Sequence, residues 1–202
     1  MANCTTWSPR KTNTSGNTFR RMPRRAPILR VARPLVPLLS WMTARYIGHH
    51  RNRLFPDSSP ISADRQAPLR GFFSDSVLTE TRIVQAVMPV PVVYPLVKIL
   101  GVKGLLEMSS IGAITLIDVV AYPAKLELST LFHELVHVVQ YRVLGLKRFA
   151  KLYVKGFLNG RGYYGIPLER QAYALTARFD EDPDKVFSVE EDVIRRSAAG
   201  LL

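Results

Sequence analysis

Apolar residues recur at helical spacing through most of the chain after residue 65, between short breaks of glycine, proline and polar residues. Spacings of three and four place apolar side chains on one face of a helix, so the segments between the breaks are predicted to be helices. Gly145 suits the end of one helix, and Pro167 suits the first turn of another. The predicted helices are 69–82, 126–144, 146–158, one beginning at Pro167, and a last one opened by the capping box Ser188-x-x-Glu191.

One run has the composition of a strand. Residues 111–120 are rich in β-branched side chains and have the length of a strand, which as an edge strand would offer free backbone groups to an extended peptide. Residues 83–100 are also apolar, but three prolines and Lys98 interrupt them, so an extended segment and a short helix are expected there rather than a membrane span. The elements together predict an α+β fold, mainly helical, with a small sheet beside helix 126–144.

The pattern before residue 66 is different. Residues 1–33 are rich in Arg, Ser, Thr, Asn and Pro, and residues 34–48 form an apolar patch that proline interrupts and that is too short to span a membrane. Prolines and polar residues in 54–70 indicate a linker. We therefore expect a basic, disordered arm with its linker over 1–65, followed by one folded domain over 66–202.

Charge is distributed as unevenly as hydrophobicity. The formal net charge is +12, and eleven of the 28 Lys and Arg residues lie in 1–56, which contain none of the 16 acidic residues. Such an arm suits contact with a polyanion, either nucleic acid or an anionic membrane, or a transit peptide; a leader without function or a start at Met22 or Met42 are the alternatives. The single cysteine, Cys4, excludes a disulfide framework and a cysteine-based zinc site. With no convincing signal peptide or transmembrane helix, the cytoplasm is the favoured compartment.

The candidate chemistry lies in helix 126–144. Residues 133–137 form a His-Glu-x-x-His motif with apolar residues on both sides. His133 and His137 are one turn apart on one helical face and can bind one metal ion, while Glu134 can act on a water molecule as a general base without being a ligand. The alternative is a pair of core histidines that form only hydrogen bonds.

A catalytic zinc ion takes three protein ligands and keeps one position open. A third His following closely would place Gly and His at positions 140 and 143, where this chain has Gln140 and Val143. Glu169 lies in the first turn of the helix that begins at Pro167, after a glycine-rich loop long enough to fold back, so it is the candidate third ligand. The alternative for Glu169 is a first-turn carboxylate that only favours the helix dipole.

These residues and their surroundings resemble a known family. The segments FHELVHVVQY at 132–141 and IPLERQAY at 166–173, with Gly145 between them, resemble a bacterial family of zincin-like proteins assigned as metallopeptidases. That family is related to the core domain found with extracellular contractile injection systems. The likeness covers roughly residues 70–180 and does not reach the basic arm.

The resemblance implies a zincin fold in which a second helix brings the Glu ligand to the metal helix. By that likeness His133, His137 and Glu169 match the metal ligands, and Glu134 matches the general base. Glu-zincins often have an Asp four residues after the ligand Glu as a partner of the metal site. Here that position is Tyr173, so the orientation of the ligands must depend on another group.

The sequence thus predicts a Zn²⁺-dependent peptidase that hydrolyses a peptide or protein substrate, with Glu134 as the base. Tyr163 and Tyr164, in the glycine-rich loop, are candidate donors to an oxyanion. One alternative is a non-catalytic domain in which zinc staples the helices and the surface binds a partner or serves as a scaffold. Another is a nucleic-acid-associated protease, whose salt-dependent binding would disappear when residues 1–56 are removed.

Overall fold

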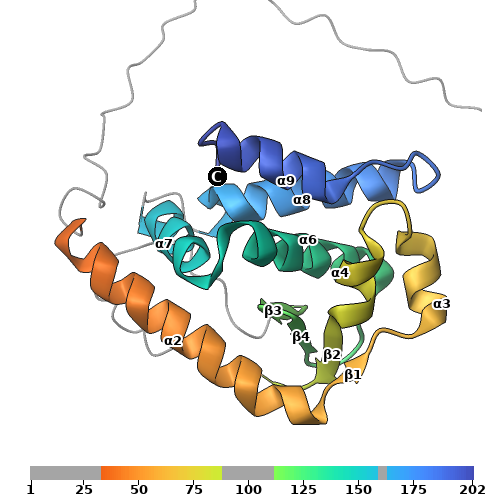
Figure 1. Ribbon diagram of the computed structural model, residues 1–202, viewed down its shortest axis with the longest axis horizontal. Helices are drawn as coiled ribbons and strands as arrows, with labels where there is room; N and C mark the ends of the chain where they lie inside the picture. Colours follow the sequence, from red (N-terminus) through yellow and green to blue (C-terminus); the bar gives the residue numbers. More distant parts are fainter. Residues whose placement is uncertain (1–32, 88–111, 159–162) are drawn as a thin grey trace, which may run out of the picture.

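The computed structural model describes residues 33–87, 112–158 and 163–202, which form an α+β fold with a small mixed sheet (Figure 1). Helix α6 (Leu128–Leu144) lies between the sheet and the helices α8 and α9 (Figure 1). The other helices are α2 (Val36–Leu54), α3 (Ala63–Gln66), α4 (Asp75–Glu80), α7 (Leu146–Gly156), α8 (Pro167–Glu181) and α9 (Val189–Ala198). The strands are β1 (Ser59–Pro60), β2 (Arg82–Gln85), β3 (Ile114–Leu116) and β4 (Val119–Tyr122).

Helix α6 is apolar around most of its circumference, and the fold buries it on all sides. Phe132 stacks on Phe179 of α8, with ring centroids 4.4 Å apart, and meets the edge of Phe72. The helix ends at Gly145, which has a positive φ of 72° and donates its N–H to the carbonyl of Tyr141. The predicted helix 126–144 and its glycine stop are therefore confirmed.

The helices after α6 also follow the sequence pattern. Helices α7 and α8 occupy the predicted segments, with Pro167 in the first turn of α8. Ser188 caps the start of α9 as predicted, because its hydroxyl accepts a hydrogen bond from the Glu191 N–H at 3.1 Å. The predicted helix 69–82 was too long, since only α4 is α-helical there. Residue 71 is a glycine with a φ of +86°, which a helix cannot accommodate.

The strand predicted at 111–120 is in fact a hairpin. Strands β3 and β4 pair antiparallel around a tight turn at Ile117, which has a φ of 64°. The sheet order is β1-β2-β4-β3, and β2 with β4 is the parallel pair, so among the described residues β3 lies at an edge of the sheet. The segment predicted at 83–100 begins as β2 and continues beyond residue 87 outside the described residues.

The boundary predicted at residue 65 was wrong. Helix α2 lies along α7, and its Arg51 forms a two-pronged ion pair with Asp118 at the β3–β4 turn, at 2.6 and 2.7 Å. Pro37 does not interrupt α2, because proline fits the first turn of a helix. A fragment that begins at residue 57 or 66 would therefore lose a helix of the fold. No helix in the described ranges is long and apolar enough to cross a membrane.

Gly156 sets the distance between α7 and the start of α8. A Cβ atom at this position would lie 2.8 Å from Cδ of Pro167 and 3.1 Å from Cα of Ile166, neither of which is the end of a flexible side chain. We therefore expect Gly156→Ala to lower the free energy of unfolding by about 1–3 kcal/mol, measured by urea unfolding.

Gly48→Ala is the matched control for this effect. It lies within α2, where an added Cβ would meet only Cδ2 of Leu146 at an ordinary 3.8 Å. The gain in helix propensity is expected to leave this variant equal to the wild type or up to about 1 kcal/mol more stable. Equal unfolding midpoints for the two variants would contradict the close approach at Gly156.

Candidate metal centre

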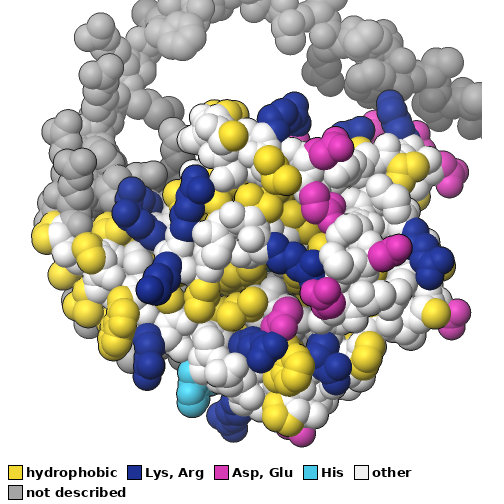
Figure 2. All heavy atoms as spheres, viewed as in Figure 1, with side chains coloured by type: hydrophobic (Ala, Val, Ile, Leu, Met, Phe, Trp, Pro, Cys, Tyr) yellow, Lys and Arg dark blue, Asp and Glu magenta, His cyan; other side chains and the backbone are white. Residues whose placement is uncertain are grey.

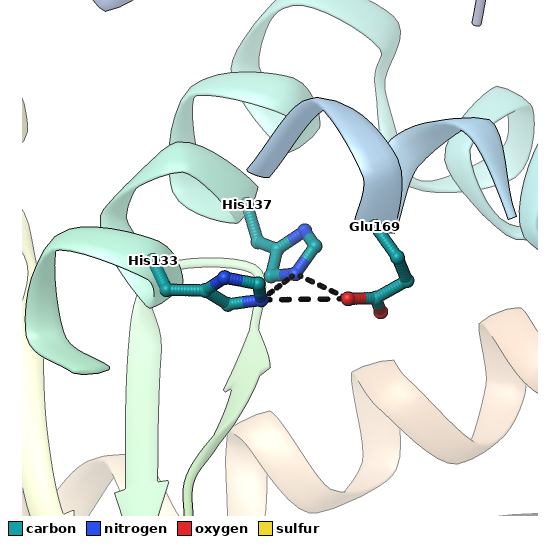
Figure 3. A group of neighbouring side chains, drawn as sticks. All are labelled: His133, His137 and Glu169. Atoms are coloured by element: carbon teal, nitrogen blue, oxygen red, sulfur yellow. Dashed lines mark hydrogen bonds and ion pairs between the residues drawn. The ribbon is translucent and has the colours of Figure 1, made fainter. Parts of the chain in front are cut away.

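Three side chains from two helices converge on one point (Figure 3). His133 and His137 project from the same face of α6, and Glu169 reaches them from the first turn of α8. All three are buried, with exposed fractions of 8%, 5% and 3%. The packing of Phe132 against Phe179 fixes α8 across α6, so the core that the two helices share also positions the third side chain.

The three donor atoms form a nearly equilateral triangle. Nε2 of His133 lies 3.2 Å from Nε2 of His137, and these nitrogens lie 3.4 and 3.3 Å from Oε2 of Glu169. Tetrahedral zinc with bonds of about 2.0–2.1 Å separates its ligand atoms by about 3.3–3.4 Å. The triangle therefore has the dimensions of three corners of a zinc coordination tetrahedron, and its two imidazoles and one carboxylate are ligand types that zinc takes in hydrolases.

Electrostatics in this cluster favour a positive charge between the three groups. Burial lowers the pKa of His137, but the negative charges of Glu169 and Glu134 outweigh it and raise the pKa to about 9. Burial likewise raises the pKa of Glu169. The charge of His137 and the hydrogen bonds that the Glu169 carboxylate accepts outweigh this effect and hold the pKa well below its usual range. An ionised carboxylate at this depth needs a cationic partner, which is either a proton on the imidazole or a metal ion in its place.

Glu134 lies beside the cluster but is not part of it. Its side chain is buried, and its Oε2 accepts a hydrogen bond of 2.6 Å from the hydroxyl of Thr115 in β3. The same hydroxyl lies 3.0 Å from the backbone carbonyl of Glu134. Strand β3 thus holds a carboxylate next to the three candidate ligands and leaves it outside the ligand triangle.

A network that the sequence did not reveal begins at His137. Its Nδ1 lies 2.8 Å from Oε1 of Gln140, whose Nε2 donates to the carbonyl of Leu168 at 3.0 Å. A backbone carbonyl only accepts hydrogen bonds, so the orientation of the Gln140 amide is fixed. Nδ1 of His137 must then be the donor, so when Nε2 is without a proton its lone pair is directed at the other two candidate ligands.

The network continues from Gln140 to the last helix. Nε2 of Gln140 also donates to Oε1 of Gln171 at 3.0 Å, and Nε2 of Gln171 donates to Asp192 of α9 at 2.8 Å. Asp192 also pairs with Arg196. This chain of side chains joins α6, α8 and α9 behind the candidate ligands. The sequence feature that indicates this network is Gln140, which lies three residues after His137 on the same helical face. From the sequence, Gln140 served only to exclude a third histidine.

We expect Gln140→Leu to weaken zinc binding by about 10–100-fold, because Nδ1 of His137 loses the acceptor that fixes its tautomer. Competition with a chromophoric chelator measures this affinity. Gln140→Glu keeps an acceptor for Nδ1 but loses the N–H that faces the Leu168 carbonyl and Gln171, so its affinity is expected to lie between those of Gln140→Leu and the wild type. Equal affinities for Gln140→Leu and the wild type would contradict the role of this amide.

Of the two tyrosines predicted as oxyanion donors, Tyr163 lies at the candidate ligands, and donation to an oxyanion stays a prediction. The Tyr163 hydroxyl donates to Oε2 of Glu169 at 2.6 Å, so Tyr163 contacts a candidate ligand. Burial and then the charge of Glu169 raise the pKa of Tyr163 well above its usual range, so the phenol stays protonated. Tyr173 packs its ring against His133, with centroids 4.6 Å apart. The side chain of Tyr164 lies outside the described residues.

The structure therefore brings together all four residues predicted for the site. Glu134, His133, His137 and Glu169 lie in one buried region, whereas the basic arm lies outside the described residues apart from α2. The chain matches no family model, no curated protein and no solved structure.

Proposed function

We propose that this protein is a zinc-dependent peptidase of the zincin type. The observation on which the proposal rests is the ligand triangle of His133, His137 and Glu169, with edges of 3.2–3.4 Å, and with the Glu134 carboxylate held beside it. A structural metal site does not need a second, non-ligating carboxylate next to its ligands, whereas peptide hydrolysis of the zincin type uses one as its general base.

The roles of the residues follow from their positions. A bound Zn²⁺ supplies a Lewis acid and a water that ionises near neutral pH. The Glu134 carboxylate accepts a proton from the attacking water and passes it to the leaving amine. Thr115 orients that carboxylate, and Gln140 keeps His137 in the tautomer that a metal requires.

The position of β3 bears on the class of substrate. This edge strand contains Thr115, and its second edge pairs with no strand among the described residues. An extended peptide that adds to β3 as a further strand would lie next to the carboxylate that Thr115 holds. We therefore propose peptide or unfolded protein segments, rather than small molecules, as the substrate class.

The experiment uses the full chain loaded with zinc and a mixed peptide library in ¹⁸O-labelled water. We expect one zinc ion per chain and new peptide ends whose carboxyl groups carry the label, because the water oxygen enters the product acid. A chelator should abolish the cleavage, and added zinc should restore it. Bound zinc without any cleavage would contradict peptidase activity, and no bound zinc would contradict the site itself.

The second candidate is a zinc-stapled binding or scaffold domain without catalysis. The burial of all three candidate ligands, with exposed fractions of 8%, 5% and 3%, favours it, because a structural metal site is closed whereas a catalytic one keeps a position open. Cobalt substitution separates the two candidates. A hydroxamate that enters an open metal position should change the visible spectrum of the cobalt form, whereas a closed structural site should not respond.

A further inference from the structure

Helices α2 and α7 pack side by side, and neither helix contains an acidic residue. The exposed basic residues of the two helices are Arg45, Arg53, Lys147, Arg148, Lys151 and Lys155. Within the described ranges none of these six pairs with a carboxylate. Arg51, by contrast, is half-buried and pairs with Asp118. The surface formed by α2 and α7, here called the α2–α7 surface, therefore has a strong positive charge.

The same surface exposes large apolar side chains. Trp41 and Leu38 on α2 are 61% and 52% exposed, and Arg45 follows Trp41 by one turn, with its guanidinium 5.9 Å from the centre of the indole ring. On α7, Lys147, Lys151 and Lys155 recur every four residues and so form one row on the helix. The surface thus combines a row of ammonium groups with an exposed indole.

Figure 2 shows how the charges are separated over the molecule. Lys and Arg side chains lie between hydrophobic side chains over α7 and α2, on the left of the view, where no acidic side chain is seen. Asp and Glu side chains lie over the centre and the right of the same face. The sequence adds to this asymmetry, because residues 1–32, which lead into α2, contain seven Arg and Lys and no acidic residue.

We propose that the α2–α7 surface binds the surface of an anionic phospholipid membrane. The cations suit the negative charge of the headgroups, and an exposed Trp beside an exposed Leu suits the boundary between headgroups and acyl chains. Nucleic acid would use the same cations, but it gives no reason for an exposed Leu38. The proposal does not depend on the metal site or on the proposed function.

The test uses full-length chain in which Trp7→Phe leaves Trp41 as the single tryptophan. Vesicles of phosphatidylcholine alone are compared with vesicles that also contain phosphatidylserine. We expect the Trp41 emission to shift to the blue and to be protected from acrylamide only with the anionic vesicles, because only there does the indole leave water.

Three variants in this background locate the contact. Replacing Lys147, Lys151 and Lys155 with Gln removes the row of cations from α7. Each cation near such a membrane contributes about fivefold, so vesicle partitioning is expected to fall by about a hundredfold. Replacing three exposed basic residues outside the surface, Arg70, Lys125 and Lys185, with Gln is the matched control and should change partitioning far less.

The third variant replaces Arg20, Arg21, Arg24 and Arg25 with Gln and separates the arm from the helices. We expect it to keep the blue shift of Trp41 with anionic vesicles, even if total binding weakens. Three results would overturn the proposal: no shift with anionic vesicles, partitioning that depends on the arm alone, or a shift that duplex DNA produces and vesicles do not.

Discussion

Glu134→Gln is expected to bind zinc as the wild type does and to lose most of its peptidase activity. The substitution keeps the shape of the side chain and removes the group that accepts the proton of the attacking water. Loss of a general base costs about 10²–10⁴-fold in rate. Because Glu134 is not among the three candidate ligands, the zinc content per chain is expected to remain unchanged. The measurement is kcat/KM on a cleaved peptide, together with metal analysis of the same sample.

The same substitution at the residue that precedes α6 controls for a general effect of lost negative charge. Glu127 precedes the first residue of the helix and is exposed, so Glu127→Gln should retain wild-type activity. If Glu134→Gln cleaves at the wild-type rate, the proposed mechanism is wrong. If it loses zinc as well as activity, Glu134 has a structural role in the site and the comparison no longer supports a base.

The candidate site could be predicted because most of its geometry is local. A spacing of four positions fixes the relation of two histidines on any helix, and a helix rich in Leu, Val and Phe has to be buried. Glu169 required one further step, since only its place at the start of a helix, after a glycine-rich loop long enough to fold back, suggested that it could return to α6. The structure places it 3.3–3.4 Å from both histidines.

The partners of these residues were not predictable, because they depend on how distant segments pack. Thr115 reaches Glu134 only because the run at 111–120 turns back at Ile117 and lays β3 against α6. The local composition does not predict that turn, since a β-branched residue such as Ile117 rarely has a positive φ. Tyr173 occupies the position where an Asp was expected, which indicated that another group must orient the ligands. Gln140 is such a group, because it hydrogen-bonds to His137.

The N-terminal boundary failed for a different reason. The prolines in 54–70 favoured a linker, and the apolar patch 34–48, which proline interrupts, was assigned to the arm. Yet Pro37 lies in the first turn of α2, and Pro60 lies in β1 at the edge of the sheet. Both places tolerate a residue without an N–H. The pairing of α2 with α7 then depends on contacts between segments about a hundred residues apart, which a local pattern does not encode.

Glu169→Ala is expected to lose zinc, with an affinity reduced by more than about 100-fold, since even loss of a group behind a ligand costs 10–100-fold. The variant removes one corner of the ligand triangle and leaves two imidazoles that cannot hold the ion alone. Thermal unfolding gives a second measurement. Zinc at about 1,000 times its dissociation constant stabilises the folded wild type by about 4 kcal/mol, and this gain should disappear in Glu169→Ala.

Two comparisons make this result specific. Glu181→Ala removes an exposed carboxylate at the other end of α8 and should keep both zinc and the thermal gain. Glu169→Gln keeps a hydrogen-bond acceptor for Tyr163 and so separates the loss of the ligand from a collapse of the loop around it. If Glu169→Gln folds with the wild-type midpoint in the absence of metal but fails to bind zinc, the carboxylate serves the metal rather than the fold. Because a stapled scaffold depends on its metal for stability, a zinc-free chain that is fully folded would argue for the catalytic interpretation.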